Sequence, residues 1–564
     1  AAGQICLTGI QSPIVRTGAG LYIVAALLIW SGGFRPASQP FRDTSRKLSR
    51  NQRIASGVLI LIVLLVAILF RFYRLHEMPP GLWWDEAQTG RVVQDILRGA
   101  IPPVYDLRIN AGTAASYLNA AWCFLVDTTG PWGLRSYAAF IGVLTVLASG
   151  WFFRQLFTSG WALFGMSLVA GSRWLVSINR TAMATIDETV LLTFLVLTLY
   201  IKAVRSGRTN HYAITGLLLG LAMHLHTGAR VLPVIIGIDI LVQLIRKPGR
   251  IRRRYGMNAA LLVFCAIVVF APMARHIYHH SEEYMKRSRE TLLSTEYPGW
   301  YPAGPILENV RYYIRMYFNH GDWHPRHNYN RTPQLPAILS VCAALGAFLS
   351  AGRFFRRREH RLMILGFCLI SLQGILTVHM NTANLNRVAE NIPIVFAWAV
   401  YGAEFVSRGI VRLAGNRRGR IAAATFAAIL TVISWWRAWD VYFNDYLPWP
   451  KLAQVYGFQP EITEMASLSK SLIQSDPEIQ VWAMYILGDP FQYVFPGDTR
   501  LHDLSIPTAP VDKADYPMAF IIPAHREEMV DWVRRTFPGA TETAIPYSLN
   551  DSVILLHLFR VSAR

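Results

Sequence analysis

The chain has 564 residues, of which 53% are hydrophobic and only 16% are charged, and its formal net charge is +20. Soluble domains carry about 25% charged residues, and several apolar runs here approach the roughly 20 residues that a bilayer crossing needs. The composition therefore excludes a disordered, fibrous or disulfide-scaffold protein and predicts a polytopic α-helical membrane protein. Residues 1–439 carry a net charge of +27 and residues 440–564 carry −7. Because Lys and Arg collect in the cytoplasmic loops of membrane proteins, we expect no nucleic-acid partner.

The N-terminal segment, residues 1–54, combines an apolar run at 17–34, which could add a spanning helix, with a basic stretch from Arg35 to Arg53. Residues 55–439 are predicted to form a multi-spanning domain, with about 11–13 spanning helices expected in total. A shorter run at 113–127 fits a helix at the membrane face or a partial insertion. The apolar segments lie near 55–72, 133–153, 161–178, 188–204, 212–227, 229–245, 257–274, 335–352, 361–379, 389–408 and 420–438.

The basic clusters between these segments all fall on one side of the membrane. By the positive-inside bias that side is cytoplasmic. The opposite, extracytoplasmic side then receives residues 73–132, 179–187, 275–334 and 380–388, together with the tail after 440. The clusters are Arg35 to Arg53, Lys202 to Arg208, Arg246 to Arg254, Arg353 to Arg361 and Arg408 to Arg420, and Arg154 joins them.

The tail, residues 440–564, changes character. Short apolar runs at 481–485, 519–523 and 552–559 are typical of strands, and helical patterns lie between them at 461–474 and 526–536. The sequence therefore predicts a small soluble α/β domain on the extracytoplasmic side.

Two pairs of adjacent carboxylates lie on the predicted outer face. Asp85 and Glu86 follow Trp84 in the first outer loop, and Asp187 and Glu188 stand at the mouth of a spanning segment. A carboxylate in the membrane is costly unless it is paired or hydrated, so both pairs are candidate catalytic or metal-binding groups. The simpler interpretations are a solvated loop for the first pair and helix N-capping for the second.

Three arginines on the same face could hold a phosphate, because a guanidinium can bond two phosphate oxygens at once. Arg387 lies at the outer end of a spanning segment, and Arg180 and Arg230 are the other candidates. The alternative for Arg387 is a lipid-headgroup anchor.

Two histidine-containing loops supply further candidate contacts. His226 lies in the turn at 224–230, and Asp322 and Arg326 in the loop at 316–336 have the character of sugar or acceptor contacts. Histidine groups in such turns are more often structural than metal-binding, so a divalent metal stays an open expectation and no ligand is assigned. The histidines in question are His224, His226, His320, His324 and His327.

Five stretches resemble the membrane glycosyltransferases with the C-type fold, specifically family 39, which includes the protein O-mannosyltransferases and the lipid A aminoarabinose transferase. The resemblance covers most of residues 70–410. The matching stretches are RFYRLHEMPPGLWWDEAQTG at 71–90, GPWGLRSYAAFIGVLTV at 130–146, HTGARVLP at 226–233, Gly321–Asn328 and Arg387–Pro393.

The resemblance implies a polyprenyl-phosphate sugar donor, an active site on the outer face, and catalytic carboxylates at Asp85 and Asp187. The chemistry agrees, because one carboxylate base and one arginine at the departing phosphate would suffice, and a single displacement would invert the anomeric centre. Trp84, Glu188 and His226 would then contact substrate. The acceptor would be a lipid, glycan or protein, and membrane lipids surround the chain.

Two other classes remain open. A transporter of lipid-linked sugars would favour charged residues deep in the membrane and repeated halves, and only Asp239 supports it. A non-catalytic subunit of a membrane complex would keep the fold without activity, but the retained Asp85 and Glu86 argue against it.

Overall fold

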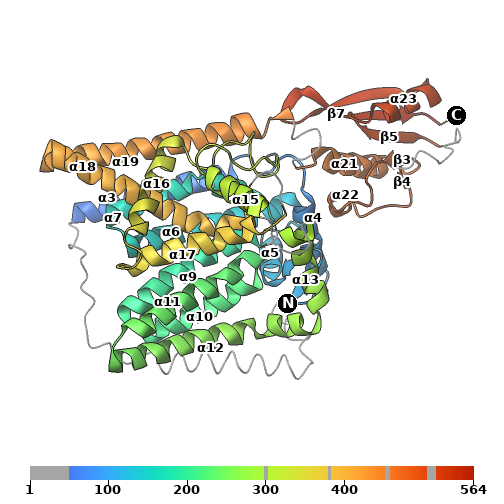
Figure 1. Cartoon of the computed structure of the whole chain (residues 1–564). Coiled ribbons are helices and arrows are strands. Elements are labelled where there is room, and N and C mark those ends of the chain that lie inside the picture. Colours follow the sequence, from blue (N-terminus) through green and yellow to red (C-terminus); the bar gives the residue numbers. More distant parts are fainter. Residues whose placement is uncertain are drawn as a thin grey trace.

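The computed structural model describes residues 50–183, 185–296, 303–378, 383–450, 458–504 and 516–563. A long helix bundle carries a smaller sheet domain at one end (Figure 1). The predicted run at 17–34 lies outside the described residues. The chain therefore has the predicted class, a multi-spanning helical protein with a C-terminal α/β domain.

All eleven predicted apolar segments are helical. Among the described residues, seven helices are long and apolar enough to cross a membrane, and α7 with α8, bent by 53°, would make an eighth. The segments at α10, α16 and α17 are shorter or carry more charge. The helices are α3 (Arg50–Phe72), α6 (Pro131–Leu156), α7 (Ser159–Ala170), α8 (Arg173–Asn179), α9 (Ile186–Ser206), α10 (Thr209–His224), α11 (Leu232–Arg246), α12 (Gly249–His279), α16 (Ala337–Ala351), α17 (Arg358–Ile375), α18 (Ile392–Ala414) and α19 (Asn416–Trp439).

Short elements cluster at the end of the bundle that carries the sheet domain, which we call the site end. The run at 113–127 forms the 12-residue helix α5, too short to span a bilayer. The elements there are α4 (Trp84–Leu97), β1 (Tyr105–Asp106), β2 (Ala111–Gly112), α5 (Ala114–Leu125), η1 (Thr227–Val231), α13 (Ser281–Thr291), α14 (Leu293–Glu296), α15 (Ala303–Arg315) and η2 (Asn386–Asn391).

The basic loops meet at the opposite end. Arg205 Nη2 lies 2.7 Å from Glu359 Oε1, which joins the end of α9 to the start of α17. Arg205 also donates to the carbonyl of Gln155, and Arg246 Nη1 donates to the carbonyl of Phe355 at 2.9 Å. Four loops that the charge pattern assigned to one side therefore touch each other.

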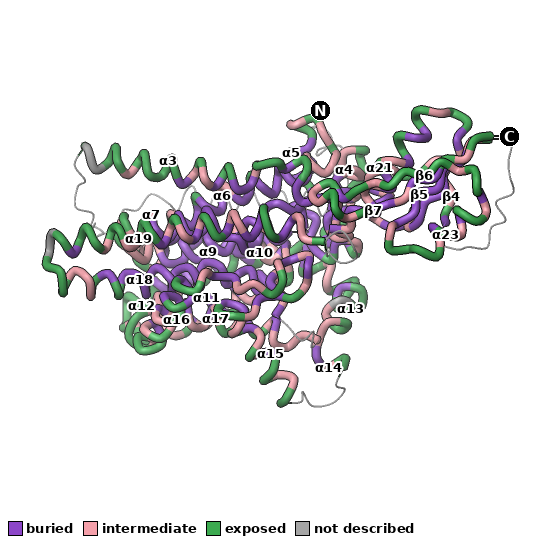
Figure 2. Tube along the Cα trace, turned by 90° about the horizontal axis from the view of Figure 1, so that it is seen from above, coloured by how far each residue is buried: buried purple, intermediate pink, exposed green. Residues whose placement is uncertain are grey.

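The bundle core is built on α6 and α9, whose most apolar stretches are each 67% buried, whereas the most apolar stretch of α3 is only 17% buried (Figure 2). Small residues allow close helix contact, as is usual in membranes. A Cβ at Gly346 would lie 2.0 Å from the Trp398 carbonyl, and one at Gly402 would lie 2.0 Å from the Cys342 carbonyl. The α16–α18 pair depends on both glycines.

The C-terminal domain has a five-stranded sheet of order β4-β3-β5-β7-β6. The strands β3 (Gln480–Ala483), β4 (Leu501–Asp503) and β5 (Met518–Pro523) are parallel, and β7 (Asn550–Val561) runs antiparallel to β5 and to β6 (Thr541–Tyr547). The remaining elements are α21 (Pro460–Ser475), α22 (Asp489–Val494), α23 (Glu527–Thr536) and the π-helix η3 (Asp440–Tyr446). Because η3 continues α19, the last span reaches Tyr446, a little beyond the predicted boundary at 440.

Glu461 in the first turn of α21 makes the stability of this domain sensitive to pH. Burial raises its pKa to about 7, and its Oε2 has no hydrogen-bond partner among the described residues. A carboxyl whose pKa is raised in the folded state stabilises the fold below its unfolded pKa and loses that contribution as pH rises through the folded value.

We therefore expect Glu461→Gln to unfold at a higher temperature than the wild type at pH 8.5, with a gain of up to roughly 3 kcal/mol, and to match it near pH 5. Thermal unfolding of the purified chain across this range measures the difference. The exposed Glu478→Gln is the control, and a gain independent of pH would contradict the assignment.

Candidate active site

Asp85 lies in the first turn of α4, which begins directly after a tight loop. Gly81 in that loop has a φ of +77°, and a Cβ there would lie 2.5 Å from Pro460 Cα. The turn therefore needs glycine, and it aims the start of α4 at the loop that carries Arg326. The Asp85 side chain is 48% exposed, and its Oδ2 lies 3.1 Å from Arg326 Nη1.

Arg326 is held on two further sides. Its guanidinium carbon lies 4.4 Å from the centre of the Trp83 ring, and its Nε donates to His327 Nε2 at 2.8 Å. A guanidinium has only donors, so the accepting nitrogen of His327 carries no proton.

The other nitrogen of His327 faces Asp322. Nδ1 lies 2.7 Å from Asp322 Oδ2, and Asp322 also accepts from the backbone N–H groups of His324 at 2.8 Å and Leu385 at 3.1 Å. Burial raises the pKa of Asp322, but His327 and these hydrogen bonds outweigh it and hold that pKa below its usual value. Burial, then Arg326, lowers the pKa of His327. Asp322 is therefore ionised and His327 neutral, with its proton on Nδ1.

Glu86 points away from this network into the protein. It is fully buried and forms a two-bond ion pair with Arg135, at 2.7 Å from Nε and 2.9 Å from Nη2. Arg135 also donates to the carbonyl of Pro79 at 2.6 Å, and Glu86 accepts from the Ala182 backbone N–H at 3.3 Å. This geometry gives Glu86 a structural role in place of the predicted catalytic one.

Asp187, at the start of α9, is buried and held by a relay. Asn179 Nδ2 donates to its Oδ1 at 2.5 Å, and Arg71 Nε donates to Asn179 Oδ1 at 3.0 Å. A Cβ at Gly142 would lie 2.3 Å from that oxygen, so the relay depends on a glycine in α6. The Asp187 side chain is therefore held by residues of two other helices, whereas a helix N-cap would bond only to its own helix.

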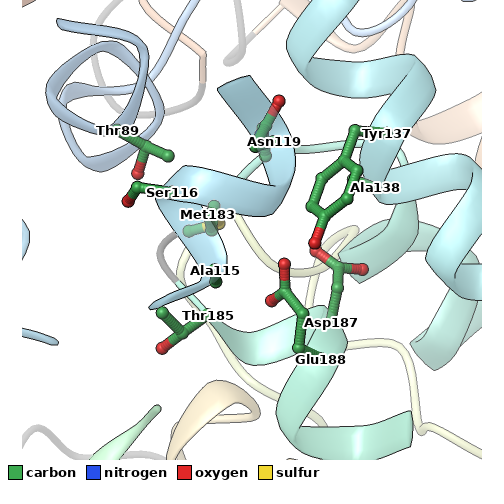
Figure 3. Close-up of a pocket in the computed structure, with 11 residues that line it drawn as sticks. Thr89, Ala115, Ser116, Asn119, Tyr137, Ala138, Met183, Thr185, Asp187 and Glu188 are labelled. Atoms are coloured by element: carbon green, nitrogen blue, oxygen red, sulfur yellow. The ribbon is translucent and has the colours of Figure 1, made fainter. Parts of the chain in front are cut away.

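Asp187 and Glu188 line a narrow pocket between α4, α5, α6 and α9. Figure 3 shows both carboxylates on the same side as the Tyr137 hydroxyl, which points toward them. The Thr185 hydroxyl has no hydrogen-bond partner among the described residues. The pocket could thus bond hydroxyl groups. Its polar lining consists of Thr89, Ser116, Asn119, Tyr137, Thr185, Asp187 and Glu188.

Two links connect this pocket to the Asp85 network. Thr89, one turn after Asp85, lines the pocket and donates to the Asp85 carbonyl at 2.8 Å. Asn386 Nδ2 lies 3.2 Å from His327 Nε2 and 3.9 Å from the sulfur of Met183, another pocket residue. Both predicted carboxylate pairs therefore belong to one region of the site end.

Arg180 does not reach this region. It is fully buried and donates to four carbonyls, those of Phe70, Arg71, Tyr73 and Met78, at 2.7 to 3.1 Å. Arg180 therefore caps the C-terminal end of α3. This structural role takes the place of the phosphate-binding role that the sequence predicted.

Three further predicted residues lie near η1 and η2: Arg230 is in η1, His226 directly precedes it, and Arg387 is in η2. Arg230 stacks on Tyr284 at 4.8 Å, and its Nη2 has no hydrogen-bond partner among the residues described. His226 Nδ1 lies 3.4 Å from Glu390 Oε1, a buried carboxylate that sequence reasoning missed. Arg387 is on η2, next to Asn386, which contacts His327.

Trp84 lies against the C-terminal domain, because a Cβ at Gly488 would be 3.0 Å from its ring. The same domain holds α4 through Asp489, which accepts from Gln88 Nε2 at 2.9 Å and pairs with Arg91. Trp83, not Trp84, therefore faces the candidate active site.

Asp239, which kept the transporter class open, is part of a buried ion pair. Arg361 Nη2 lies 2.7 Å from its Oδ1, and Tyr200 donates to its Oδ2 at 2.7 Å. The sequence feature that favoured transport thus has a structural explanation.

Across the described ranges, no group of three or more His, Cys, Asp or Glu side chains is arranged to hold a metal ion. Asp187 and Glu188 are adjacent carboxylates in one pocket, but a third such ligand does not join them there. The expectation of a divalent metal remains untested.

Comparison with solved structures finds membrane proteins that share the fold of this chain. No family model matches the chain, and no curated protein matches it. The apo oligosaccharyltransferase of Archaeoglobus fulgidus is similar, with a TM-score of 0.51 and 13% identity over 88% of this chain and 70% of that one. The archaeal oligosaccharyltransferase AglB from Archaeoglobus fulgidus, in complex with an inhibitory peptide and a dolichol-phosphate, has a TM-score of 0.51 and 12% identity over 79% of this chain and 64% of that one. ArnT from Cupriavidus metallidurans bound to undecaprenyl phosphate has a TM-score of 0.47 and 12% identity over 91% of this chain and 98% of that one.

The role of Glu86 can be tested through its partner. Glu86→Gln should destabilise the chain by about 3–5 kcal/mol, because it leaves the buried charge of Arg135 uncompensated. Thermal unfolding in detergent measures the loss. The control Glu77→Gln removes an exposed pair with Arg74 and should cost about 0–1 kcal/mol. A Glu86→Gln chain with wild-type stability but no turnover would return Glu86 to a catalytic role.

Proposed function

We propose that the chain is a membrane glycosyltransferase that moves a sugar from a polyprenyl-phosphate donor to an acceptor hydroxyl at the site end, which we assign to the extracytoplasmic face. The observation that carries this proposal is the Asp85–Arg326 pair. A half-exposed carboxylate and an oriented guanidinium lie together where the spanning helices meet the C-terminal domain. A lipid-linked phosphate must lie at this level, since its tail stays in the bilayer.

The two groups suit the two halves of such a reaction. The Asp85 carboxylate would take the proton of the acceptor hydroxyl as its oxygen attacks the anomeric carbon. The bond to the phosphate oxygen breaks, and the phosphate leaves with the bonding electrons. Arg326 would stabilise that developing charge. One displacement of this kind inverts the anomeric centre.

Arg326 is the better-defined candidate for the donor phosphate, because Trp83 and His327 fix its plane. An arginine whose fork is already oriented loses less entropy when it binds an anion. Arg387 is proposed as a second phosphate contact, since η2 places it beside the residue that bonds His327. Arg230 is the third candidate.

The pocket of Asp187 and Glu188 is proposed to bind hydroxyl groups of a substrate sugar. Carboxylates and hydroxyls are the side chains that satisfy such groups, and the pocket has both. The acceptor, whether lipid, glycan or protein, would approach from the side of the C-terminal domain, which holds α4.

The fold agrees with this proposal, since an archaeal oligosaccharyltransferase that shares it has been seen with a dolichol-phosphate. Membership of family 39 remains a proposal that rests on the sequence resemblance. Among the described residues, no contact specifically favours a transporter or a purely structural subunit.

The first test is Asp85→Asn, assayed with undecaprenyl-phosphate and dolichyl-phosphate sugars as release of the lipid phosphate in reconstituted membranes. Turnover should fall by about two orders of magnitude or more, while donor binding stays near normal. Asp95→Asn, at the other end of the same helix, is the control and should stay active. Ordinary turnover in Asp85→Asn would overturn the assignment, and failure of every donor to bind the wild type would overturn the proposed function.

The second test compares Arg326→Lys with Arg387→Lys. Lysine keeps the charge but not the two-pronged geometry, so Arg326→Lys should weaken donor affinity by about tenfold or more. Arg387→Lys should be impaired if Arg387 also bonds the phosphate and near wild type if it anchors a headgroup. Affinity is measured by displacement of a fluorescent prenyl phosphate in nanodiscs. Arg326→Ala and Arg387→Ala remove the charge as well, and unchanged affinity in both would move the phosphate to Arg230.

A further inference from the structure

A pocket separate from the candidate active site opens between the helix bundle and the C-terminal domain. Its volume is about 870 Å³, counted with its open side, and this lies within the usual range for small-molecule sites. Three parts of the chain form its walls: the segment after α3, the junction of α19 with η3, and the turn between β6 and β7. The residues that line it are Tyr73, Arg74, Met78, Trp439, Phe443, Asn444, Pro448, Ser548, Leu549 and Asp551.

The walls of this pocket are fixed by hydrogen bonds within the protein. Arg180 Nη2 donates to the carbonyls of Tyr73 at 2.7 Å and Met78 at 2.9 Å, which holds the segment after α3. Tyr547 and Asn550 flank the turn between β6 and β7, and they donate to two successive carbonyls directly after η3 at 2.7 and 3.2 Å. The pocket is therefore preformed.

Three aromatic rings form one face of the pocket. Between ring centres, Trp439 lies 4.4 Å from Phe443, and Tyr73 lies 4.9 Å from Trp439 and 5.4 Å from Phe443. Phe443 is buried, whereas Tyr73 is 37% exposed and Trp439 is partly exposed. The buried ring supports the two outer rings. The face of an aromatic ring is rich in electrons, so it attracts the C–H groups of a sugar ring.

Accessible polar side chains lie on the other walls, since Asn444, Ser548 and Asp551 are all exposed. Asn444 Nδ2 donates to Asp440 at 3.1 Å, which leaves the Asn444 oxygen as an acceptor. Among the residues that the structure describes, none bonds or pairs with the side chain of Ser548 or Asp551. The hydroxyl groups of an occupant can therefore reach and bond all three side chains.

The charges of the pocket disfavour a phosphate. Among its lining residues Arg74 is the only cation, and its Nε donates to Glu77 at 2.7 Å in an ion pair. The Asp551 carboxylate adds negative charge, and neither a carboxylate nor an ionised phosphate has a proton to donate to the other. A neutral ligand with several hydroxyl groups avoids this repulsion.

The ring arrangement disfavours a quaternary ammonium group as well. Such a group is held in a cage whose ring faces surround it. Here the three rings contact one another at 4.4 to 5.4 Å, so no space for a ligand remains between them. The rings instead offer an outer surface, on which another ring can stack.

We propose that this pocket is a binding site for a neutral oligosaccharide. One sugar ring stacks on Tyr73 and Trp439, and its hydroxyl groups donate to Asn444 and Asp551. The site is additional to the pocket of Asp187 and to the Asp85 network, since it shares no lining residue with either.

The saccharide pocket nevertheless shares an element with the candidate active site. Phe443 in the pocket and Tyr446 lie three positions apart on η3. The Tyr446 hydroxyl donates at 2.6 Å to the carbonyl of Pro325, which directly precedes Arg326. A saccharide bound here therefore rests on the element that holds the loop of Arg326.

The test measures binding by saturation-transfer NMR and titration, with the full-length chain in phospholipid nanodiscs, which avoid detergents that carry sugar. The probes are mannobiose, cellobiose, galactobiose and maltotriose, and the wild type should bind at least one. Asp551→Ala should weaken that binding by about tenfold, because it removes a hydrogen bond to a charged group. Asp445→Ala removes another exposed carboxylate, on η3 and outside the lining, and should bind as the wild type does.

A second pair of variants tests the aromatic surface. Trp439→Ala removes part of it and should weaken binding by about tenfold or more. Trp436→Ala is the matched control, since Trp436 lies three positions earlier on α19, is 60% exposed and does not line the pocket. Thermal unfolding checks that Trp439→Ala is folded, and Asp551→Ala, an exposed position, tests the site if it is not.

Failure of all four probes to bind the wild type would overturn the proposal, and so would undiminished affinity in Asp551→Ala. Displacement of the saccharide by an equal concentration of glycerophosphocholine would overturn it as well, since the pocket would then hold a phospholipid headgroup. No readout depends on sugar transfer, so the result stands apart from the proposed function.

Discussion

An arginine side chain can donate hydrogen bonds but cannot accept them, and the candidate active site is ordered by this restriction. Because Arg326 donates through Nε, the nearer nitrogen of His327 must accept. The proton of His327 then lies on Nδ1 and requires an acceptor, which Asp322 supplies. The direction of each hydrogen bond fixes the direction of the next. At the end of this series the Arg326 guanidinium donates to Asp85. The same order explains why burial does not protonate Asp322.

Buried arginines keep the surrounding backbone in place. Arg71, Arg135 and Arg180 are each at most 2% exposed, and a buried charge is tolerated only when it is paired or hydrogen-bonded. Arg180 meets this need with four carbonyls after α3, and Arg135 meets it with Glu86 and the loop before α4. The carbonyl groups of the loop that precedes Asp85 therefore satisfy buried arginines, and these hydrogen bonds fix the loop in return. The site is pre-organised in this way before any substrate binds.

Local patterns sufficed to predict the spanning helices and the strands β3, β5 and β7, because hydrophobic periodicity is set by the element itself. The strands β4 and β6, which complete the sheet, were not predicted. Pairing between distant residues was not predictable: Asp85 and Arg326 are 241 positions apart, and Glu86 and Arg135 are 49 apart. The chemistry of the two side chains does not separate Asp85 from Glu86, yet neighbours on a helix point about 100° apart. One faces the open network and the other a buried cation. For the same reason Trp84, which we expected to contact substrate, lies against the C-terminal domain, whereas Trp83 packs on Arg326.

Helical spacing also lets α4 serve two structures at once. Asp85 and Thr89, four positions apart, face the candidate active site, whereas Gln88 and Arg91, three positions apart, face Asp489 of the C-terminal domain. The domain is thus joined to the bundle through the helix that carries the proposed base. Because α4 is rigid over one turn, a displacement of the domain would move the Asp85 carboxylate relative to Arg326.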